Sequence, residues 1–140
     1  MHAIVLVQGL RQGKLPEALS KLVERHYRHF LGGTHGTVDI CRLKVDPSIA
    51  PSVAFELSSA LMPAGYYARI NDETRMFVSF PTSVSYVLRS DPQTAIVARK
   101  VGQLYGVKGE HMRFEEMFEL DHPEMHDLIG GGGSAGSDDD

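Results

Sequence analysis

The sequence has one cysteine, no long apolar run and little net charge outside its last residues. Because Cys41 is the only cysteine, an internal disulfide is excluded, which suits a reducing compartment. The longest apolar run, residues 3–7, has the length of a strand and is too short to cross a membrane. The first residues have neither a basic flank nor a small-residue cleavage site, so we expect no secretory signal. These absences predict a cytoplasmic protein that does not bind membranes.

The formal net charge of −4 comes mostly from the end of the chain. Asp138, Asp139 and Asp140 close a Gly/Ser-rich stretch, and the remaining acidic residues nearly balance the 14 Lys and Arg. The charge of the folded part therefore argues neither for nor against an anionic partner. Residues 130–140 are predicted to be a disordered, dispensable tail, because Gly and Ser cannot offset the entropy lost on ordering. The length of the rest predicts one domain, residues 1–129.

The spacing of apolar residues predicts alternating strands and helices. We expect strands at residues 3–7, 37–45, 66–70, 75–80 and 84–88, and a short last strand at 110–114. We expect helices at residues 15–30, 51–61 and 92–105, then a helical turn at 115–120 and a short helix from about Asp121. Asp91 and Gly106 are suited to cap the third helix. Val78 and Phe80 are predicted to be buried.

The order of elements over residues 37–118 is strand, helix, strand, strand, helix, strand, which is the ferredoxin-like pattern. Residues 1–36 add a β-α unit in front, so the predicted class is α+β with a largely antiparallel sheet. Sequence similarity covers residues 61–68 (LMPAGYYA), Asp72, residues 76–80 (MFVSF), 105–107 and 112–114. In these segments the chain resembles a set of short bacterial proteins of uncharacterised activity. The resemblance implies the ferredoxin-like core and implies no particular activity.

One set of basic and aromatic residues is predicted to point outward from the same side of the sheet. Its members are Arg42, Lys44, Tyr67, Arg69, Arg75, Phe77, His111 and Arg113. Such a surface is typical of domains that bind single-stranded nucleic acid, although most of the RNA-recognition signature is missing. Two other interpretations remain open. The first helix covers this face, or two copies of the chain pair sheet to sheet around Tyr67 and Phe77.

A glycine-containing loop separates the first predicted strand from the first predicted helix. Its residues Gly9, Arg11, Gly13 and Lys14 fit a loop that binds an anion through backbone N–H groups and a lysine. The spacing is one residue short of the nucleotide-binding P-loop, and Leu15 occupies the position of the magnesium-binding Ser or Thr. An ordinary strand–helix connection is the simpler interpretation.

Histidines offer a weak metal pattern. His122 and His126 are four residues apart, so a helix would place both on one face, but two ligands do not complete a site. His26 and His29 share the first predicted helix, and His26 is expected to pack in its apolar stripe. Cys41 is expected in the core rather than as a nucleophile. We therefore expect neither a bound metal nor a cofactor.

The sequence alone favours a non-catalytic binding or regulatory module that acts through the basic-aromatic face or as a homodimer. One alternative is a small enzyme with a site near residues 9–14 or around the histidines. Another is a protein that binds single-stranded nucleic acid or a different polyanion. An enzyme requires a concave site where polar groups converge, whereas a binding module requires an exposed surface.

Overall fold

The computed structural model describes residues 1–32 and 36–123 of the chain. The strands are β1 (His2–Leu6), β2 (Val23–Gly32), β3 (Gly36–Lys44), β4 (Ala68–Asn71), β5 (Arg75–Phe80) and β6 (Ser83–Leu88). The α-helices are α1 (Glu17–Ser20), α2 (Ala50–Ala60), α3 (Pro92–Leu104) and α4 (Phe114–Met117). Three 3₁₀ turns, η1 (Val7–Gly9), η2 (Pro47–Ile49) and η3 (Gly109–His111), complete the description. The predicted tail and the helix expected from Asp121 lie mostly outside the described residues.

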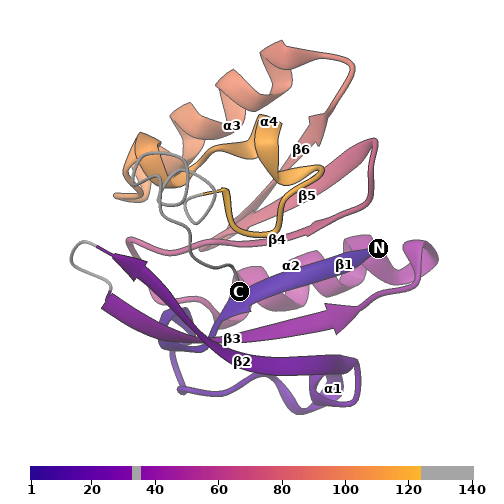
Figure 1. Cartoon of the computed structure of the whole chain (residues 1–140), viewed down its shortest axis with the longest axis vertical. Coiled ribbons are helices and arrows are strands. Elements are labelled where there is room, and N and C mark those ends of the chain that lie inside the picture. The colour runs from indigo at the N-terminus through magenta and orange to yellow at the C-terminus, as the bar shows by residue number, and fades with distance from the viewer. Residues whose placement is uncertain (33–35, 124–140) are drawn as a thin grey trace, which may run out of the picture.

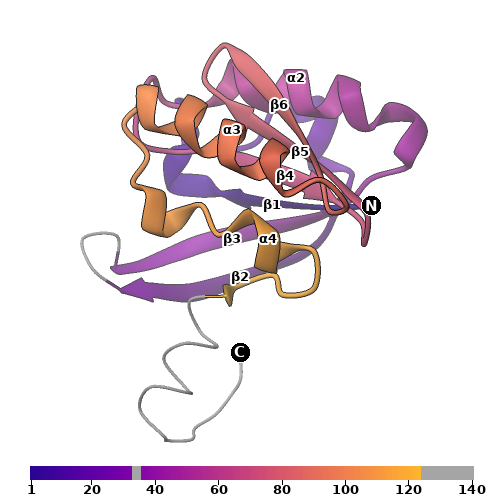
Figure 2. The same ribbon diagram turned by 90° about the horizontal axis from the view of Figure 1, so that it is seen from above.

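All six strands form one sheet in the order β2-β3-β1-β4-β5-β6, and every neighbouring pair is antiparallel. Figure 1 shows β2 at one edge of the sheet and β6, followed by α3, at the other. Figure 2 shows α2 on one face and both α3 and α4 on the opposite face. We call these the α2 face and the α3 face. The predicted α+β class is therefore confirmed, with helices on both sides of an antiparallel sheet.

The α2 face carries one apolar core. Ala3 pairs with Leu43 and with Ile70 in neighbouring strands, and Val5 pairs with Cys41. Directly paired residues point to the same face of a sheet, and these five are all buried on the α2 side. Helix α2 covers them with Ala50, Val53, Ala54 and Leu57. Each fully buried Val, Leu or Ile side chain stabilises the fold by about 1.5–3 kcal/mol.

A second core lies between the sheet and α3. Val78 and Phe80 are fully buried there, which confirms the sequence prediction for both residues. The other members of this core are Met76, Val87, Ala95, Ala98, Val107, Met112, Phe114, Met117 and Phe118. Gly102 allows α3 to approach closely, because a Cβ there would lie 2.3 Å from the Met112 sulfur. Strand β5 therefore has a packed layer on each of its two faces.

Most predicted elements are present close to their expected bounds. The strands β1, β3, β4, β5 and β6 and the helices α2 and α3 match the sequence prediction. The side chain of Asp91 accepts a hydrogen bond from Gln93 N at the start of α3. Gly106 follows the end of α3 with a φ of 82°, as expected of a helix-terminating glycine.

The helix predicted at residues 15–30 is wrong. Only Glu17–Ser20 is helical, and residues 23–32 form β2, which pairs with β3 at the sheet edge. The side chains at every second position of β2, namely Tyr27, His29 and Leu31, point to the α3 face, and Tyr27 pairs with Ile40. Apolar residues in this segment fit both a helical and an alternating spacing, and pairing with β3 decides for the strand. His26 is exposed, so its predicted packing is also wrong.

The strand predicted at residues 110–114 is wrong as well. This segment forms η3 and the start of α4, with Met112 and Phe114 buried against α3. The carbonyl of His111 accepts a hydrogen bond from the Tyr67 hydroxyl rather than from a neighbouring strand. Without this strand, and with β1 placed between β3 and β4, the ferredoxin-like order is not confirmed. The predicted β-α unit at the N-terminus is replaced by two strands of the common sheet.

No helix in the described part of the chain is long and apolar enough to cross a membrane.

Candidate functional site

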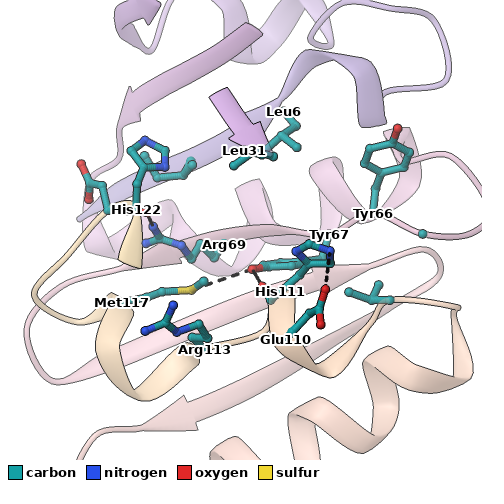
Figure 3. A pocket seen from close by; sticks show the side chains of 14 residues that line it. Leu6, Leu31, Tyr66, Tyr67, Arg69, Glu110, His111, Arg113, Met117 and His122 are labelled. Carbon is teal, nitrogen blue, oxygen red and sulfur yellow. Dashed lines mark hydrogen bonds and ion pairs between the residues drawn. The ribbon is translucent and has the colours of Figure 1, made fainter. Parts of the chain in front are cut away.

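A cavity of about 90 Å³ opens on the α3 face where the cover supplied by α3 ends (Figure 3). It lies between the β1-β2 part of the sheet and the chain that follows α3. Its walls come from β1, β2, β4, the loop before β4, η3, α4 and the residues after α4. The lining residues are Ile4, Leu6, Leu31, Gly65, Tyr66, Tyr67, Arg69, Val107, Glu110, His111, Arg113, Met117, Asp121 and His122.

The loop before β4 is fixed by two glycines. Gly65 has a φ of 88°, and its N–H donates to the carbonyl of Tyr105 at the end of α3. Gly9 lies so close to the ring of Tyr66 that a Cβ at Gly9 would be 2.9 Å from that ring. These contacts hold Tyr66 as one side wall of the cavity. The hydroxyl of Tyr67, the next residue, donates to the carbonyl of His111 at 2.6 Å and so joins the loop to η3.

One wall of the cavity is apolar. Ile4 and Leu6 of β1 and Leu31 of β2 point to the α3 face, and Ile4 belongs to a small cluster with Val38 and Ile40. In Figure 3, Leu6 and Leu31 lie together on the side of the cavity away from His111. This cluster forms because the α3 face of β1, β2 and β3 extends beyond the reach of α3.

Polar residues line the rest of the cavity and form its polar wall, and Arg69 is the most buried of them. Arg69 is 3% exposed and pairs directly with Ile4 across the β1-β4 ladder. Its guanidinium donates to Asn71 Oδ1 at 2.7 Å and to the backbone carbonyl of Asp121. A buried charge requires hydrogen bonds of this kind, because leaving water costs it several kcal/mol. Arg69 thus holds a positive charge at the cavity wall.

Two further basic groups stand at the other end of the polar wall. Arg113 forms a two-point ion pair with Glu116, at 2.8 Å and 2.6 Å. His111 Nε2 lies 3.8 Å from the carboxylate of Glu110. Figure 3 shows the His111 ring on the cavity side of η3, next to Tyr67.

The residues after α4, which we call the closing segment (residues 118–123), cross the sheet and bound the cavity. The carboxylate of Asp121 accepts a hydrogen bond from Arg42 at 3.1 Å. The ring of His122 stacks on His29, with centroids 3.9 Å apart, and its Nε2 lies 2.5 Å from the hydroxyl of Tyr27. Burial, together with the nearby carboxylate of Asp121, raises the pKa of Tyr27 to about 12. Polar contacts therefore attach the closing segment to three strands.

The structure separates the predicted basic-aromatic residues. Tyr67, Arg69, His111 and Arg113 line the cavity. Arg42 lies on the same face of the sheet, where it is bonded to Glu24 and Asp121. Lys44, two residues further along the strand, is exposed.

The placement predicted for Arg75 and Phe77 is wrong. Phe77 pairs directly with Ile70, so it points to the α2 face and packs against the core there. Arg75 lies two residues earlier on the same strand and shares this direction. The prediction assumed one buried face, whereas this sheet is covered on both. Tyr67 and Phe77 consequently lie on opposite sides, and no sheet-to-sheet pairing can use both.

The predicted anion-binding loop uses its backbone groups internally. The N–H of Arg11 donates to Ala60 O, and the N–H of Gly13 donates to Leu10 O. The guanidinium of Arg11 donates to Ser59 O at 2.7 Å. Lys14 is exposed in a shallow hollow between this loop and α2, and Gly9 packs against Tyr66. The helix that follows has four residues, so it offers no extended N-terminus to an anion.

No group of three metal-ligating side chains occurs among residues 1–32 and 36–123. The predicted pair His122 and His126 is only half described, since His126 falls outside these ranges. Cys41 is buried on the α2 face, and burial followed by the charge of Asp39 raises the pKa of its thiol. A raised pKa reduces the reactive thiolate, which fits a core cysteine.

Sequence reasoning missed Tyr66, Asp121 and the apolar wall as parts of one site. The available signal was Arg42 and Arg69, each of which interrupts an apolar strand on the side that Ile4 occupies. Comparison of the chain with protein-family models, curated proteins and solved structures finds no match. The site is therefore interpreted from its own geometry.

Proposed function

We propose that the protein is a small-molecule binding module whose ligand is an organic acid with an apolar body. The observation that carries this proposal is the position of Arg69, which is 3% exposed and lines the cavity directly beside its apolar wall. A carboxylate reaching that wall gains a charge-assisted interaction in a setting with little water. The apolar body of the ligand packs against Leu6, Leu31 and Tyr66.

The size of the cavity limits the ligand. Each water requires about 10–15 Å³ on this volume scale, so about 90 Å³ holds only a handful of waters. A small acid fits such a space, whereas a nucleotide or a polymer does not. His111 and His122 add side chains that can donate a hydrogen bond to an oxygen of the ligand.

The other functions suggested by the sequence have less support. A surface for single-stranded nucleic acid would need Phe77 and Arg75 beside Tyr67 and Arg69, and the two pairs face opposite ways. An enzyme of residues 9–14 would need backbone N–H groups open to an anion, and those of Arg11 and Gly13 are bonded within the fold. A homodimer remains a prediction and has a separate candidate surface, described below.

The test compares acids with their uncharged amides. Butyrate and pentanoate at millimolar concentration should raise the melting temperature, and their matched amides should not. A ligand at a concentration 100 times its Kd stabilises the native state by about 2.7 kcal/mol. Calorimetric titration of the stabilising acid gives the Kd. Equal responses to acid and amide, or no response to any acid, would overturn the proposal.

Two variants locate the site. Arg69→Gln should abolish the response to acids, while Arg28→Gln, at an arginine whose side chain is 75% exposed, should retain it. Because Arg69 is buried, its loss can also unfold the protein. Leu31→Trp therefore provides an independent variant that fills the cavity from the edge strand. A folded Leu31→Trp protein with undiminished acid binding would place the ligand elsewhere.

A further inference from the structure

The two edge strands of the sheet differ in chemistry. The edge strand β2 carries Glu24, Arg25 and Arg28, and charges of this kind normally prevent an edge from pairing with another chain. The edge strand β6 has the sequence SVSYVL and carries no charge and no proline. Among the strands of the described residues, β6 pairs only with β5, and its last residue, Leu88, also forms a single bridge with Asp91. Its outer edge therefore lacks the features that discourage strand addition.

The outward-facing backbone groups of β6 can be assigned from its ends. The N–H of Leu88 donates to the hydroxyl of Thr94, whereas the N–H of the next residue, Arg89, donates to Thr74 beside β5. In an antiparallel ladder the direction of these groups alternates along the strand. The N–H and C=O of Val84 and Tyr86 therefore point away from β5, as those of Leu88 do.

Exposed apolar side chains flank this edge on both faces. Along α3, the side that begins at Thr94 continues through Val97 and Leu104, which are 52% and 86% exposed. On the other face, Tyr86 is 45% exposed and its ring lies 5.1 Å from that of Phe77. Phe55 of α2 is 62% exposed and lies one turn before Ser58, whose hydroxyl reaches the β5-β6 turn. Apolar surface on both sides of an open edge is typical of an interface.

We infer that β6 pairs with β6 of a second copy of this chain, in antiparallel register around a two-fold axis at Ser85. Val84 and Tyr86, the outward-facing residues before Leu88, are separated by one residue, so this axis places Val84 opposite the partner's Tyr86 and Tyr86 opposite the partner's Val84. Both pairs are hydrogen-bonded pairs, which gives four backbone hydrogen bonds. The two six-stranded sheets become continuous across the axis.

The self-complementary register is the reason for choosing a second copy over a foreign strand. A two-fold axis presents the same surface from both chains. The exposed apolar residues that flank β6 in one copy therefore lie beside those that flank β6 in the other copy. The axis also places Ser85 opposite the partner's Ser85 in a pair that is not hydrogen-bonded. In such pairs the Cα atoms are about 4.5 Å apart, which is within the range that a disulfide spans.

Oligomeric state is the first measurement. Light scattering coupled to size exclusion should give a dimer for the full chain, and Tyr86→Lys should weaken dimerisation by about tenfold or more, since charges oppose edge pairing. Phe30→Lys is the matched control, because it puts the same charge in place of a 53% exposed aromatic on the opposite edge strand. A monomeric wild type, or a dimer that Tyr86→Lys leaves intact, would overturn the inference.

Disulfide trapping tests the register. Ser85→Cys should form an intermolecular disulfide under mild oxidation, whereas Ser83→Cys should not, since the proposed axis places Ser83 opposite the partner's Val87. The native Cys41 is buried and serves as the internal background. Crosslinking of Ser83→Cys without crosslinking of Ser85→Cys would refute the register. Recovery of a wild-type monomer bound to a foreign chain that Tyr86→Lys releases would assign the edge to that chain instead.

Discussion

The two faces of the sheet are covered in different ways. On the α2 face, one helix packs on aliphatic residues from β1, β3 and β4, and the layer is apolar apart from small hydroxyl groups such as that of Ser79, which donates to Ala54 O. On the α3 face, the same kind of packing covers β5 and β6 but stops before β1, β2 and β3. There the closing segment takes over with contacts from Arg42, Arg69 and Tyr27, and the cavity lies at the change.

This difference teaches where a small fold places a site. A layer made mostly of aliphatic side chains packs with little empty space, because such side chains interdigitate to crystal-like density. Arginines cannot pack this way, since each guanidinium needs several oriented acceptors. The chain satisfies Arg42 and Arg69 with carboxylate and carbonyl groups from an irregular segment, and the cavity lies where this segment meets the sheet.

The largest effect is expected from a charge placed in the apolar part of the α3 face. Val78→Asp should abolish soluble expression, because Val78 is 0% exposed and an unpaired buried charge costs several kcal/mol. Thr37→Asp, at an exposed position of β3, should express normally. The yield of soluble protein is the measurement, and urea denaturation follows for any variant that can be purified. A cooperatively folded Val78→Asp protein would show that the packing between the sheet and α3 accommodates a buried charge, as the part of the same face around Arg69 does.

A smaller loss is expected where α3 approaches the sheet. In Gly102→Ala the new Cβ would lie 2.3 Å from the Met112 sulfur and 2.9 Å from Phe80, so α3 or Met112 must move. Overpacking of this kind costs about 1–3 kcal/mol, partly offset by the better helix propensity of Ala. Lys100→Ala, on the exposed side of the same helix, should change the free energy of unfolding by less than about 0.5 kcal/mol. Equal stabilities of the two variants would mean that α3 packs loosely.

The smallest effect should depend on pH and should come from the polar cover. Tyr27→Phe removes the hydroxyl that contacts His122, which costs about 1 kcal/mol near neutral pH. Because the folded pKa of Tyr27 is raised from 10.0 to about 12, its stabilising effect is complete below pH 10 and is lost as the pH rises toward 12. The stability difference between wild type and Tyr27→Phe should therefore shrink over that window.

Tyr105 gives the control for this titration. Hydrogen bonds with Ser83 and Thr82 lower the pKa of Tyr105, so its contribution to stability is present at high pH and is lost as the pH falls through the lowered value. Phenolate absorbance, compared among wild type, Tyr27→Phe and Tyr105→Phe, separates the two tyrosines. A Tyr27 that ionises at or below pH 10 would show that the closing segment does not bury it.

Local signals in the sequence determined most of the elements. Strict alternation specified β3, β5 and β6, and the Asp91 cap with Gly106 specified the bounds of α3. The burial of Val78 and Phe80 was predictable, because alternation identifies residues that share one face of a strand. The prediction holds whichever of the two faces that is. Four residues of the cavity, namely Tyr67, Arg69, His111 and Arg113, had also been selected from sequence as one basic-aromatic group.

Tertiary structure alone decided which of these residues meet. Residues 23–32 satisfy helical and alternating patterns at once, and only the free edge of β3 makes the strand more favourable than the helix. The face that Phe77 occupies depends on its pairing with Ile70 and on helices that cover both sides, which no periodicity within β5 reports. The cavity likewise requires β1, η3 and the closing segment to converge from opposite ends of the chain. Such contacts depend on long-range packing, because a sequence pattern determines on which side of its strand or helix a residue lies but does not determine which residues it contacts.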